Sequence, residues 1–189
     1  MRARENPFRS EKVADFRYQI EADTLADWRE QITSVPSIRW AIMGPEGTGK
    51  SILLEDLAQM LPTVEWVRIK EDDSVRRKVK MAIRLFRPSH IPLFFDGAET
   101  LPRFIWSPRY FFRSKIVATL HHPRKSFTVH YTTKFEPKVV ISLVETLLQS
   151  KISQNEAERI LQIGRRNNGN VREILRQLYL ETSSENQSP

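Results

Sequence analysis

The sequence predicts an α/β fold: a doubly wound, mostly parallel sheet with a small C-terminal helical lid. Short apolar segments alternate with segments whose apolar residues recur at helical spacing, which is typical of parallel strands joined by helices. A glycine-rich segment, Gly-Pro-Glu-Gly-Thr-Gly-Lys-Ser at 44–51, stands between the first such strand and helix. Two helices that begin with capping boxes end the pattern and predict the lid.

The first elements are predicted by their caps and apolar periods. Asp23 or Thr24 can cap a helix with apolar residues at i, i+3 and i+7, and Pro36 ends that region. Residues 38–43 are mostly apolar and predict the first, buried strand. Residues 52–61 follow the glycine-rich segment, and their helical spacing predicts the first crossover helix.

Four further strands are expected. Residues 64–69 alternate between apolar and polar side chains and predict the second strand. Residues 91–96 and 115–120 are apolar and predict the third and fourth strands, and residues 127–131 predict a fifth.

A basic helix lies between the second and third strands. Asp72, Asp73 and Ser74 are good helix starters, and Pro88 ends the helix. We expect its inner face to be apolar. The residues expected on that face are Val75, Val79, Ala82, Ile83 and Phe86.

The C-terminal third of the sequence predicts helices. Residues 138–149 are apolar at helical spacing, and the pairs Ser153–Glu156 and Asn170–Glu173 are capping boxes before two more helices. We therefore divide the chain into three parts. These are a nucleotide-binding domain with an N-terminal helical segment (1–135), a helical lid subdomain (136–181) and a disordered tail (182–189).

Composition excludes several kinds of site. The chain has 189 residues and no cysteine, so it has no disulfide, thiolate metal site or cysteine nucleophile. No apolar run approaches the ~20 residues that cross a bilayer. The charged N-terminus lacks the apolar core of a signal peptide. We therefore expect a cytoplasmic protein without a membrane span.

Positive charge is concentrated in two stretches. The net charge is +7, with six basic residues and no acid in 75–87, and seven basic residues and no acid in 100–135. Either stretch could bind a polyanion such as nucleic acid or acidic lipid, or a protein partner. The alternative is a solvated face that steers nucleotide toward its site.

The glycine-rich segment predicts a phosphate-binding loop. Its glycines let the backbone approach phosphate, and the helix that follows adds its positive N-terminal end. Lys50 would reach the β- and γ-phosphates of ATP, and the Ser51 hydroxyl would hold Mg²⁺. The residues expected to contact the nucleotide are Gly44, Pro45, Glu46, Gly47, Thr48, Gly49, Lys50, Ser51 and Ile52.

Further polar residues follow the third and fourth strands. Asp96 ends the third strand, 46 residues after Lys50, and could hold Mg²⁺ through water together with Ser51. Glu99 is the best candidate to orient the attacking water. Thr119 ends the fourth strand, where its hydroxyl could sense the γ-phosphate, and His121 follows it.

These segments resemble the additional-strand-glutamate P-loop ATPases. Residues 44–51, 93–99 and 116–119 look like the Walker A, Walker B and sensor-1 segments, and Asp-Gly-x-Glu is similar to the Asp-Gly-Leu-Asp pattern of STAND-type ATPases. Residues 169–173 resemble the start of the sensor-2 helix of AAA+ ATPases, which implies that Arg172 reaches phosphate from the lid. AAA+ ATPases usually place a glutamate where this chain has Gly97.

The sequence leaves three functions open. The first is an AAA+/STAND-like protein that binds ATP and Mg²⁺, hydrolyses ATP and acts as a conformational switch. The second is a small-molecule kinase with arginines that clamp an acidic substrate. The third is an ATPase stimulated by nucleic acid through the basic helix 75–87.

Overall fold

The chain forms two units, and residues 45–49 of the glycine-rich loop belong to a different unit from the strand and helix that flank them. The computed structural model describes residues 6–8, 17–102, 105 and 113–185. Unit 1 comprises residues 1–19, 45–49 and 134–189, and unit 2 comprises residues 20–44 and 50–133. None of the described helices is long and apolar enough to cross a membrane.

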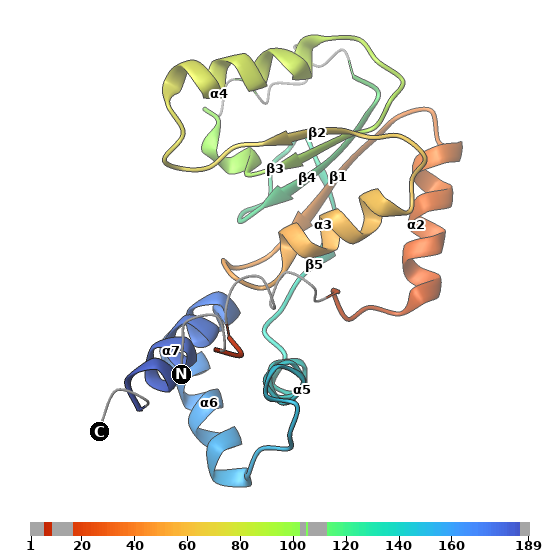
Figure 1. The fold of residues 1–189 in the computed structure, drawn as a ribbon. Helices are drawn as coiled ribbons and strands as arrows, with labels where there is room; N and C mark the ends of the chain where they lie inside the picture. The colour runs from red at the N-terminus through yellow and green to blue at the C-terminus, as the bar shows by residue number, and fades with distance from the viewer. Residues whose placement is uncertain (1–5, 9–16, 103–104, 106–112, 186–189) are drawn as a thin grey trace. The chain divides into compact units, whose positions relative to one another are not determined.

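Unit 2 is built on a five-stranded sheet in which every strand pair is parallel (Figure 1). The strand order is β2-β3-β4-β1-β5, so β4 lies between β1 and β3. The predicted α/β fold with a parallel sheet is therefore confirmed. The strands are β1 (Ile38–Met43), β2 (Glu65–Arg68), β3 (Leu93–Asp96), β4 (Lys115–Leu120) and β5 (Thr128–Thr132).

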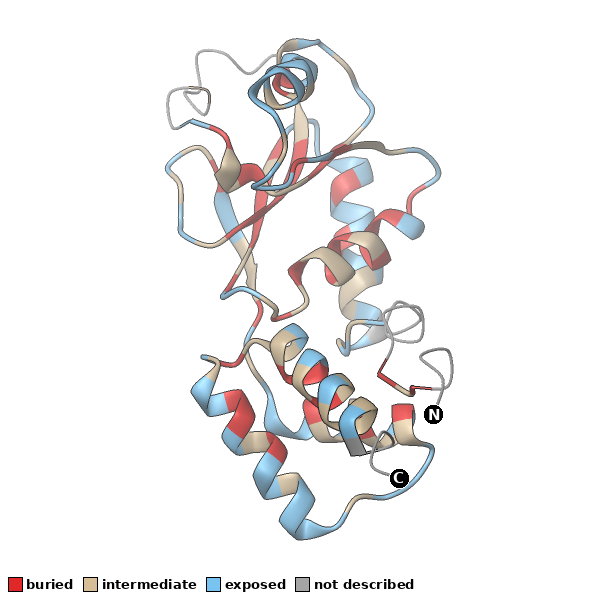
Figure 2. Ribbon diagram, turned by 60° about the vertical axis from the view of Figure 1, so that its left-hand side comes forward, coloured by how far each residue is buried: buried red, intermediate tan, exposed pale blue. Residues whose placement is uncertain are grey.

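Helices cover both faces of this sheet. Figure 1 shows α3 and α4 on opposite sides of it, and Figure 2 shows that the strands carry many of the buried residues of unit 2. Alternate strand residues such as Val67, Phe95 and Ala118 pack in one core with Ala82 and Leu85. The helical elements are α2 (Ala22–Ser34), α3 (Lys50–Gln59), α4 (Val75–Ala82) and the 3₁₀ turns η2 (Ile83–Phe86) and η3 (Ala98–Thr100).

The apolar face expected for the basic helix is partly wrong. Ala82 is buried, but the side chains of Val75, Val79 and Ile83 are exposed, at 77%, 53% and 48%. The α-helix ends at Ala82, and a 3₁₀ turn with three residues per turn follows, so Ala82 and Leu85 share the inner face. The apolar residues at four-residue spacing, which suggested a face buried in the core, therefore lie on the surface.

Helix caps agree with the sequence at three of four predicted starts, one of them at Asn170, whose Oδ1 accepts a hydrogen bond from the backbone N–H of Glu173. The Ser74 side chain accepts a hydrogen bond from the backbone N–H of Arg77, and Ser153 and Glu156 form the predicted capping box. Helix α2 instead begins after Glu21, whose side chain makes no capping bond. The predicted cap by Asp23 or Thr24 is therefore wrong.

The described residues of unit 1 form three helices around a core of their own. Phe8 lies in this core, and the Asn6 side chain donates hydrogen bonds to the Tyr179 carbonyl and the Ser183 hydroxyl, both at 3.0 Å. These contacts fix residues 6–8 to the C-terminal helices. The helices are α5 (Pro137–Leu148), α6 (Gln154–Arg166) and α7 (Val171–Glu185).

Helix α7 is longer than the sequence predicted. It continues to Glu185 and so includes the first four residues of the segment 182–189, which was expected to be a disordered tail. The hydroxyls of Thr182 and Ser183 donate to carbonyls of the preceding turn, which lets these polar residues remain helical. Residues 186–189 lie outside the described part of the chain.

Candidate nucleotide-binding site

The glycine-rich loop contacts the start of α7, within unit 1. The backbone N–H of Val171 donates to the Gly47 carbonyl at 3.2 Å. Gly47 has a φ of +71°, and a Cβ there would lie 1.9 Å from Asn170 Oδ1, so only glycine fits this position. Asn170 also caps α7, because its Oδ1 accepts from the backbone N–H of Glu173. The sequence predicted this cap but not the contact with the loop.

Two polar side chains begin α3 at the end of the loop. Lys50 is buried, and its Nζ donates to the Gly44 carbonyl at 2.8 Å. The Ser51 hydroxyl donates to Asp96 Oδ1 at 2.9 Å, which joins α3 to the end of β3. The predicted pair of oxygen ligands, Ser51 and Asp96, is thus in direct contact.

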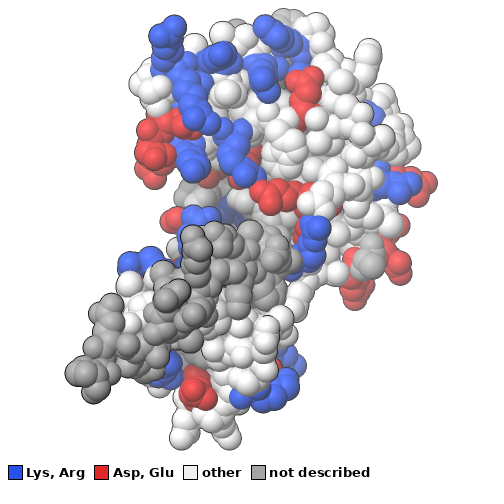
Figure 3. Space-filling model, in the orientation of Figure 1, with Lys and Arg blue, Asp and Glu red and all other residues white. Residues whose placement is uncertain are grey.

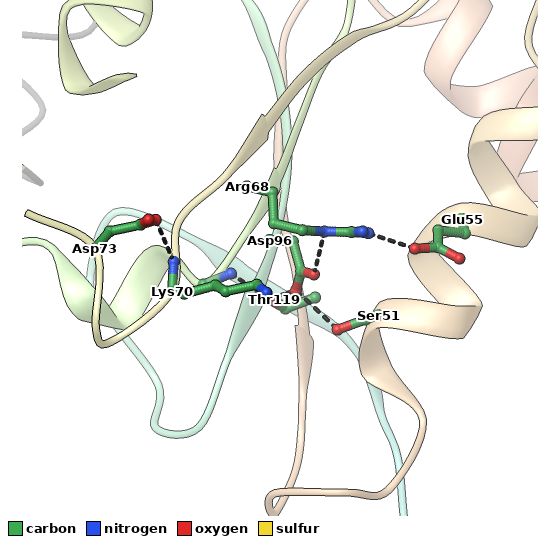
Figure 4. Close-up of polar contacts among 8 residues, drawn as sticks. Ser51, Glu55, Arg68, Lys70, Asp73, Asp96 and Thr119 are labelled. Atoms are coloured by element: carbon green, nitrogen blue, oxygen red, sulfur yellow. Dashed lines mark hydrogen bonds and ion pairs between the residues drawn. The ribbon is translucent and has the colours of Figure 1, made fainter. Parts of the chain in front are cut away.

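Asp96 is held by donors from three different elements (Figure 4). Its Oδ1 accepts hydrogen bonds from Ser51 on α3 and from Thr119 on β4, each at 2.9 Å. Its Oδ2 accepts from Arg68 Nε on β2 at 3.0 Å. The buried Thr119 hydroxyl also accepts from the Gly97 backbone N–H at 3.0 Å. Thr119 therefore orients Asp96, while its contact with phosphate stays a prediction.

Arg68 is a site residue that sequence reasoning missed. It lies opposite Asp96 in the parallel pairing of β2 with β3, and its guanidinium also bonds to Glu55 on α3. The guanidinium carbon lies 5.5 Å from the centre of the Trp66 ring. Burial lowers the pKa of Arg68, but its bond to Glu55 and the charge of Asp96 outweigh burial, and the pKa is raised overall.

Glu99 lies in η3, immediately after the turn that follows β3. Its Oε1 lies 3.1 Å from His121 Nε2, just beyond the end of β4. Its Oε2 is buried, and no described residue donates a hydrogen bond to it. Buried acceptors are normally satisfied, so this oxygen is suited to a water molecule. The predicted role of Glu99 with the attacking water stays a prediction.

The residues present fit Mg²⁺ rather than a metal held wholly by protein. Among the described residues there is no group of three or more His, Asp or Glu side chains that could hold a metal ion. Ser51 and Asp96 supply one hydroxyl and one carboxylate at hydrogen-bond distance. Mg²⁺ prefers few protein oxygens, several waters and the phosphates of its nucleotide, and this pair suits that preference.

The other predicted contacts remain untested. Thr48 is buried and donates to the Pro45 carbonyl at 2.8 Å, whereas Glu46 is exposed. Ile52 lies in the first turn of α3. Arg172 is exposed in the first turn of α7, in unit 1, and its approach to phosphate stays a prediction.

The two basic stretches differ in how many of their Lys and Arg side chains are bonded within the fold. Figure 3 shows Lys and Arg side chains gathered over the part of unit 2 that carries α4. In the second stretch, Arg113 is buried and donates to Glu65 at 2.6 Å, and Lys115 Nζ donates to the Ile32 carbonyl at 2.6 Å. Both are therefore committed to the fold. Arg103 and Arg109 lie outside the described residues.

Comparison with known proteins finds a resemblance in structure only. No protein-family model matches the chain, and no curated protein matches it. A RuvB variant from Thermotoga maritima superposes with a TM-score of 0.57 at 18% identity, over 90% of this chain and 64% of that one. NtrX from Brucella abortus, solved in complex with ATP, gives 0.52 at 14% identity, over 89% and 51%.

This resemblance identifies the fold. A further T. maritima RuvB structure, described as a Holliday junction branch migration motor, matches with a TM-score of 0.52 at 16% identity, over 92% of this chain and 63% of that one. The chain thus spans less than two thirds of these RuvB and NtrX chains. With the parallel sheet and the loop between β1 and α3, these similarities show a P-loop NTPase fold.

Proposed function

We propose that the protein binds ATP with Mg²⁺ at residues 44–52, hydrolyses it slowly and acts as a conformational switch. The observation that carries this proposal is the convergence of Ser51 and Thr119 on Asp96. These residues come from three elements, and both hydroxyls donate to Asp96 Oδ1 at 2.9 Å. The strand order, with β4 between β1 and β3, also supports the additional-strand class suggested by the sequence.

Each residue has a stated role in this proposal. Lys50 binds the β- and γ-phosphates once it leaves the Gly44 carbonyl, and Ser51 and Asp96 hold Mg²⁺. Bound Mg²⁺ would neutralise charge on the phosphates. Glu99 orients water through its unpartnered oxygen, and Arg172 contacts the γ-phosphate. Residues 136–181 would then change state with the nucleotide.

Phosphate release from Mg-ATP by the purified protein tests this proposal. Turnover that disappears in Lys50→Ala would support it, because the ammonium stabilises the transferred charge. A fluorescent ATP analogue measures binding separately from turnover. Absence of both binding and turnover in the folded wild type, or turnover equal in Lys50→Ala, would contradict the proposal.

A second candidate function is stimulation by nucleic acid. It is supported by the exposed Arg76 and Lys80 of α4 and by Arg87, which follows η2. None of these three side chains has a partner among the described residues. Contacts with phosphates release counterions, so binding would weaken steeply as salt rises. Duplex and single-stranded DNA are the probes, measured between low and physiological salt. Arg76→Gln combined with Lys80→Gln should flatten that salt dependence, and unchanged binding would remove α4 as the contact surface.

The third alternative, a small-molecule kinase, has weaker support. Of the arginines proposed to clamp a substrate, Arg113 is buried and bonded to Glu65 and to two backbone carbonyls. It is therefore unavailable to a substrate without unfolding its surroundings. Consumption of ATP without release of free phosphate, dependent on an added acidic metabolite, would favour the kinase over the switch.

A further inference from the structure

Arg68 occupies the position from which a cation can reach the metal-binding carboxylate. It ends β2, directly opposite Asp96 at the end of β3, and the two side chains extend from the same face of the sheet. The guanidinium bonds to Asp96 Oδ2 and to Glu55, so it lies between two carboxylates (Figure 4). The Asp96 side chain is 14% exposed, and those of Arg68 and Glu55 are 47% and 44% exposed.

Asp96 has little remaining capacity for another cation. A carboxylate has about four acceptor sites, and three are used by Ser51, Thr119 and Arg68. The two hydroxyls are neutral donors and can remain beside a hydrated metal ion. Arg68 is positively charged, so it neutralises the carboxylate and repels a second cation at short range.

Arg68 also has partners other than Asp96. Its bond to Glu55 does not involve Asp96, and both residues line an open pocket of about 460 Å³ between α3 and β2. Trp66 lines the same pocket, and its ring already lies 5.5 Å from the guanidinium. The guanidinium can therefore withdraw from Asp96 while keeping a carboxylate and an aromatic face as partners.

We propose that Arg68 is a built-in counter-ion of Asp96 that competes with Mg²⁺, and that metal binding shifts the guanidinium onto Glu55. This raises the Mg²⁺ concentration needed for metal-dependent nucleotide binding. It also holds the Asp96 carboxylate in its orientation while no metal is bound. The inference rests on the proposed function, because it concerns the Mg²⁺ partner of the same nucleotide.

A magnesium titration tests this directly, with nucleotide binding as the measurement. A fluorescent ATP analogue is bound to the full chain first in EDTA and then at increasing Mg²⁺, and the half-saturating Mg²⁺ concentration is compared between variants. Arg68→Gln should lower that concentration by about fivefold or more, in the range usual for coupled ligands. Arg68→Lys, which keeps the charge but loses the planar fork, should lower it less.

Two further variants separate this effect from general electrostatics. Arg76→Gln removes the same charge from the exposed surface of α4, and the half-saturating Mg²⁺ concentration should stay within about twofold of wild type. Glu55→Gln removes the second acceptor and should raise the half-saturating concentration. Circular dichroism verifies that each variant is folded, and if Arg68→Gln does not fold, Arg68→Lys decides.

The outcomes are distinct. A lower Mg²⁺ requirement in both Arg68 variants, with Arg76→Gln unchanged, supports the inference. The same Mg²⁺ requirement in wild type and the folded Arg68 variants, or an equal shift in Arg76→Gln, overturns it while leaving nucleotide binding intact. Failure of the wild type to bind the analogue with or without Mg²⁺ overturns the proposed function and this inference together.

Discussion

Gly97 explains why the second carboxylate of the site is Glu99. The φ of Gly97 is +82°, and a Cβ there would lie 2.0 Å from the Ile69 carbonyl oxygen. The backbone N–H of Ile69 also donates to the Asp96 carbonyl at 3.0 Å, and this bond fixes the distance between the two segments of the backbone. No side chain fits immediately after Asp96, so the nearest position for an acid is further along the turn.

Replacing Gly97 should therefore destabilise the protein. Gly97→Ala combines a left-handed backbone with a clash against backbone atoms, and we expect a loss of at least about 2 kcal/mol in the free energy of unfolding. Urea unfolding followed by circular dichroism measures it. Glu99→Gln is the control, since it changes no backbone conformation. Equal unfolding midpoints for Gly97→Ala and wild type would contradict the steric account.

The carboxylate of Glu99 should matter for turnover and not for affinity. Glu99→Gln should retain binding of the ATP analogue and reduce phosphate release about 10²-fold, the low end for loss of a general base. His121→Gln should give a smaller reduction, because His121 only holds one Glu99 oxygen. Phosphate release at saturating Mg-ATP measures both. Turnover by Glu99→Gln at the wild-type rate would remove Glu99 from the mechanism.

Site residues that belong to a sequence motif could be predicted. Site residues that reach the site only through the pairing of neighbouring strands could not. Ser51 and Asp96 were placed by the loop motif and by an apolar strand that ends in an acid. Arg68 belongs to the site because β2 pairs with β3 in a register that brings it opposite Asp96. That register is a tertiary property, and nothing in the sequence around Arg68 specifies it.

At the scale of elements, α4 shows that a regular spacing of apolar residues can occur on an exposed face as well as on a buried one. The sequence Val-Arg-x-x-Val-Lys-x-x-Ile-Arg over 75–84 repeats every four residues, which suggested a core stripe. The structure buries the i, i+3 pair Ala82 and Leu85 instead, because a 3₁₀ turn replaces the last turn of α-helix. The exposed apolar row consequently runs beside the cations of the same helix.

Strand β5 carries a histidine that should make stability depend on pH. The His130 ring stacks on Trp40 at 3.7 Å between centroids and meets the edge of Trp28 at 4.7 Å. Burial lowers the pKa of His130, and its Nε2 has no hydrogen-bond partner among the described residues. The folded state therefore favours the neutral ring, while the unfolded chain takes up a proton below its ordinary pKa of about 6.5.

The sign of the effect follows from this difference. Stability from neutral His130 is present above pH ~6.5 and is lost as pH falls through that value toward the lower pKa of the folded state. We expect the thermal midpoint to decrease between pH 7.5 and pH 5.5. His130→Phe keeps an aromatic ring between the tryptophans and should reduce that decrease. An identical pH profile in wild type and variant would contradict the prediction.

At the scale of the whole molecule, the fold class and all five strands were predictable from apolar segments and turn residues. The division of the chain was not, because units 1 and 2 are defined by contacts between distant segments. The boundary expected at residue 135 rested on a change from strand to helix patterns. The predicted lid and the predicted domain limits therefore stay predictions, and measurements with bound nucleotide would test them.

A buried arginine outside the site joins several segments of unit 2. Arg113 donates to the carbonyls of Arg84 and Ile91 at 2.9 and 3.1 Å and to the Glu65 carboxylate. The hydrogen bond from Arg113 lowers the pKa of Glu65. Arg113→Ala removes one hydrogen bond from each of these three acceptors, and we expect a loss of about 3 kcal/mol in the free energy of unfolding.

Urea unfolding at neutral pH measures this loss. Arg124→Ala is a suitable control, because no hydrogen bond or ion pair of its side chain is found among the described residues, and it should unfold within about 0.5 kcal/mol of wild type. A loss below about 1 kcal/mol for Arg113→Ala would contradict the structural role assigned to it.

The contact between Gly47 and the start of α7 limits how the gene can be shortened. Residues 45–49 leave unit 2 after Gly44 and return to it at Lys50, yet they pack with a helix encoded more than a hundred residues later. A fragment ending at Thr133 would keep every strand of the sheet and lose the surface against which the loop rests. A shortened version of this protein that keeps the loop in this conformation must therefore retain the start of α7, and replacing the C-terminal helices would remove the contacts of Gly47.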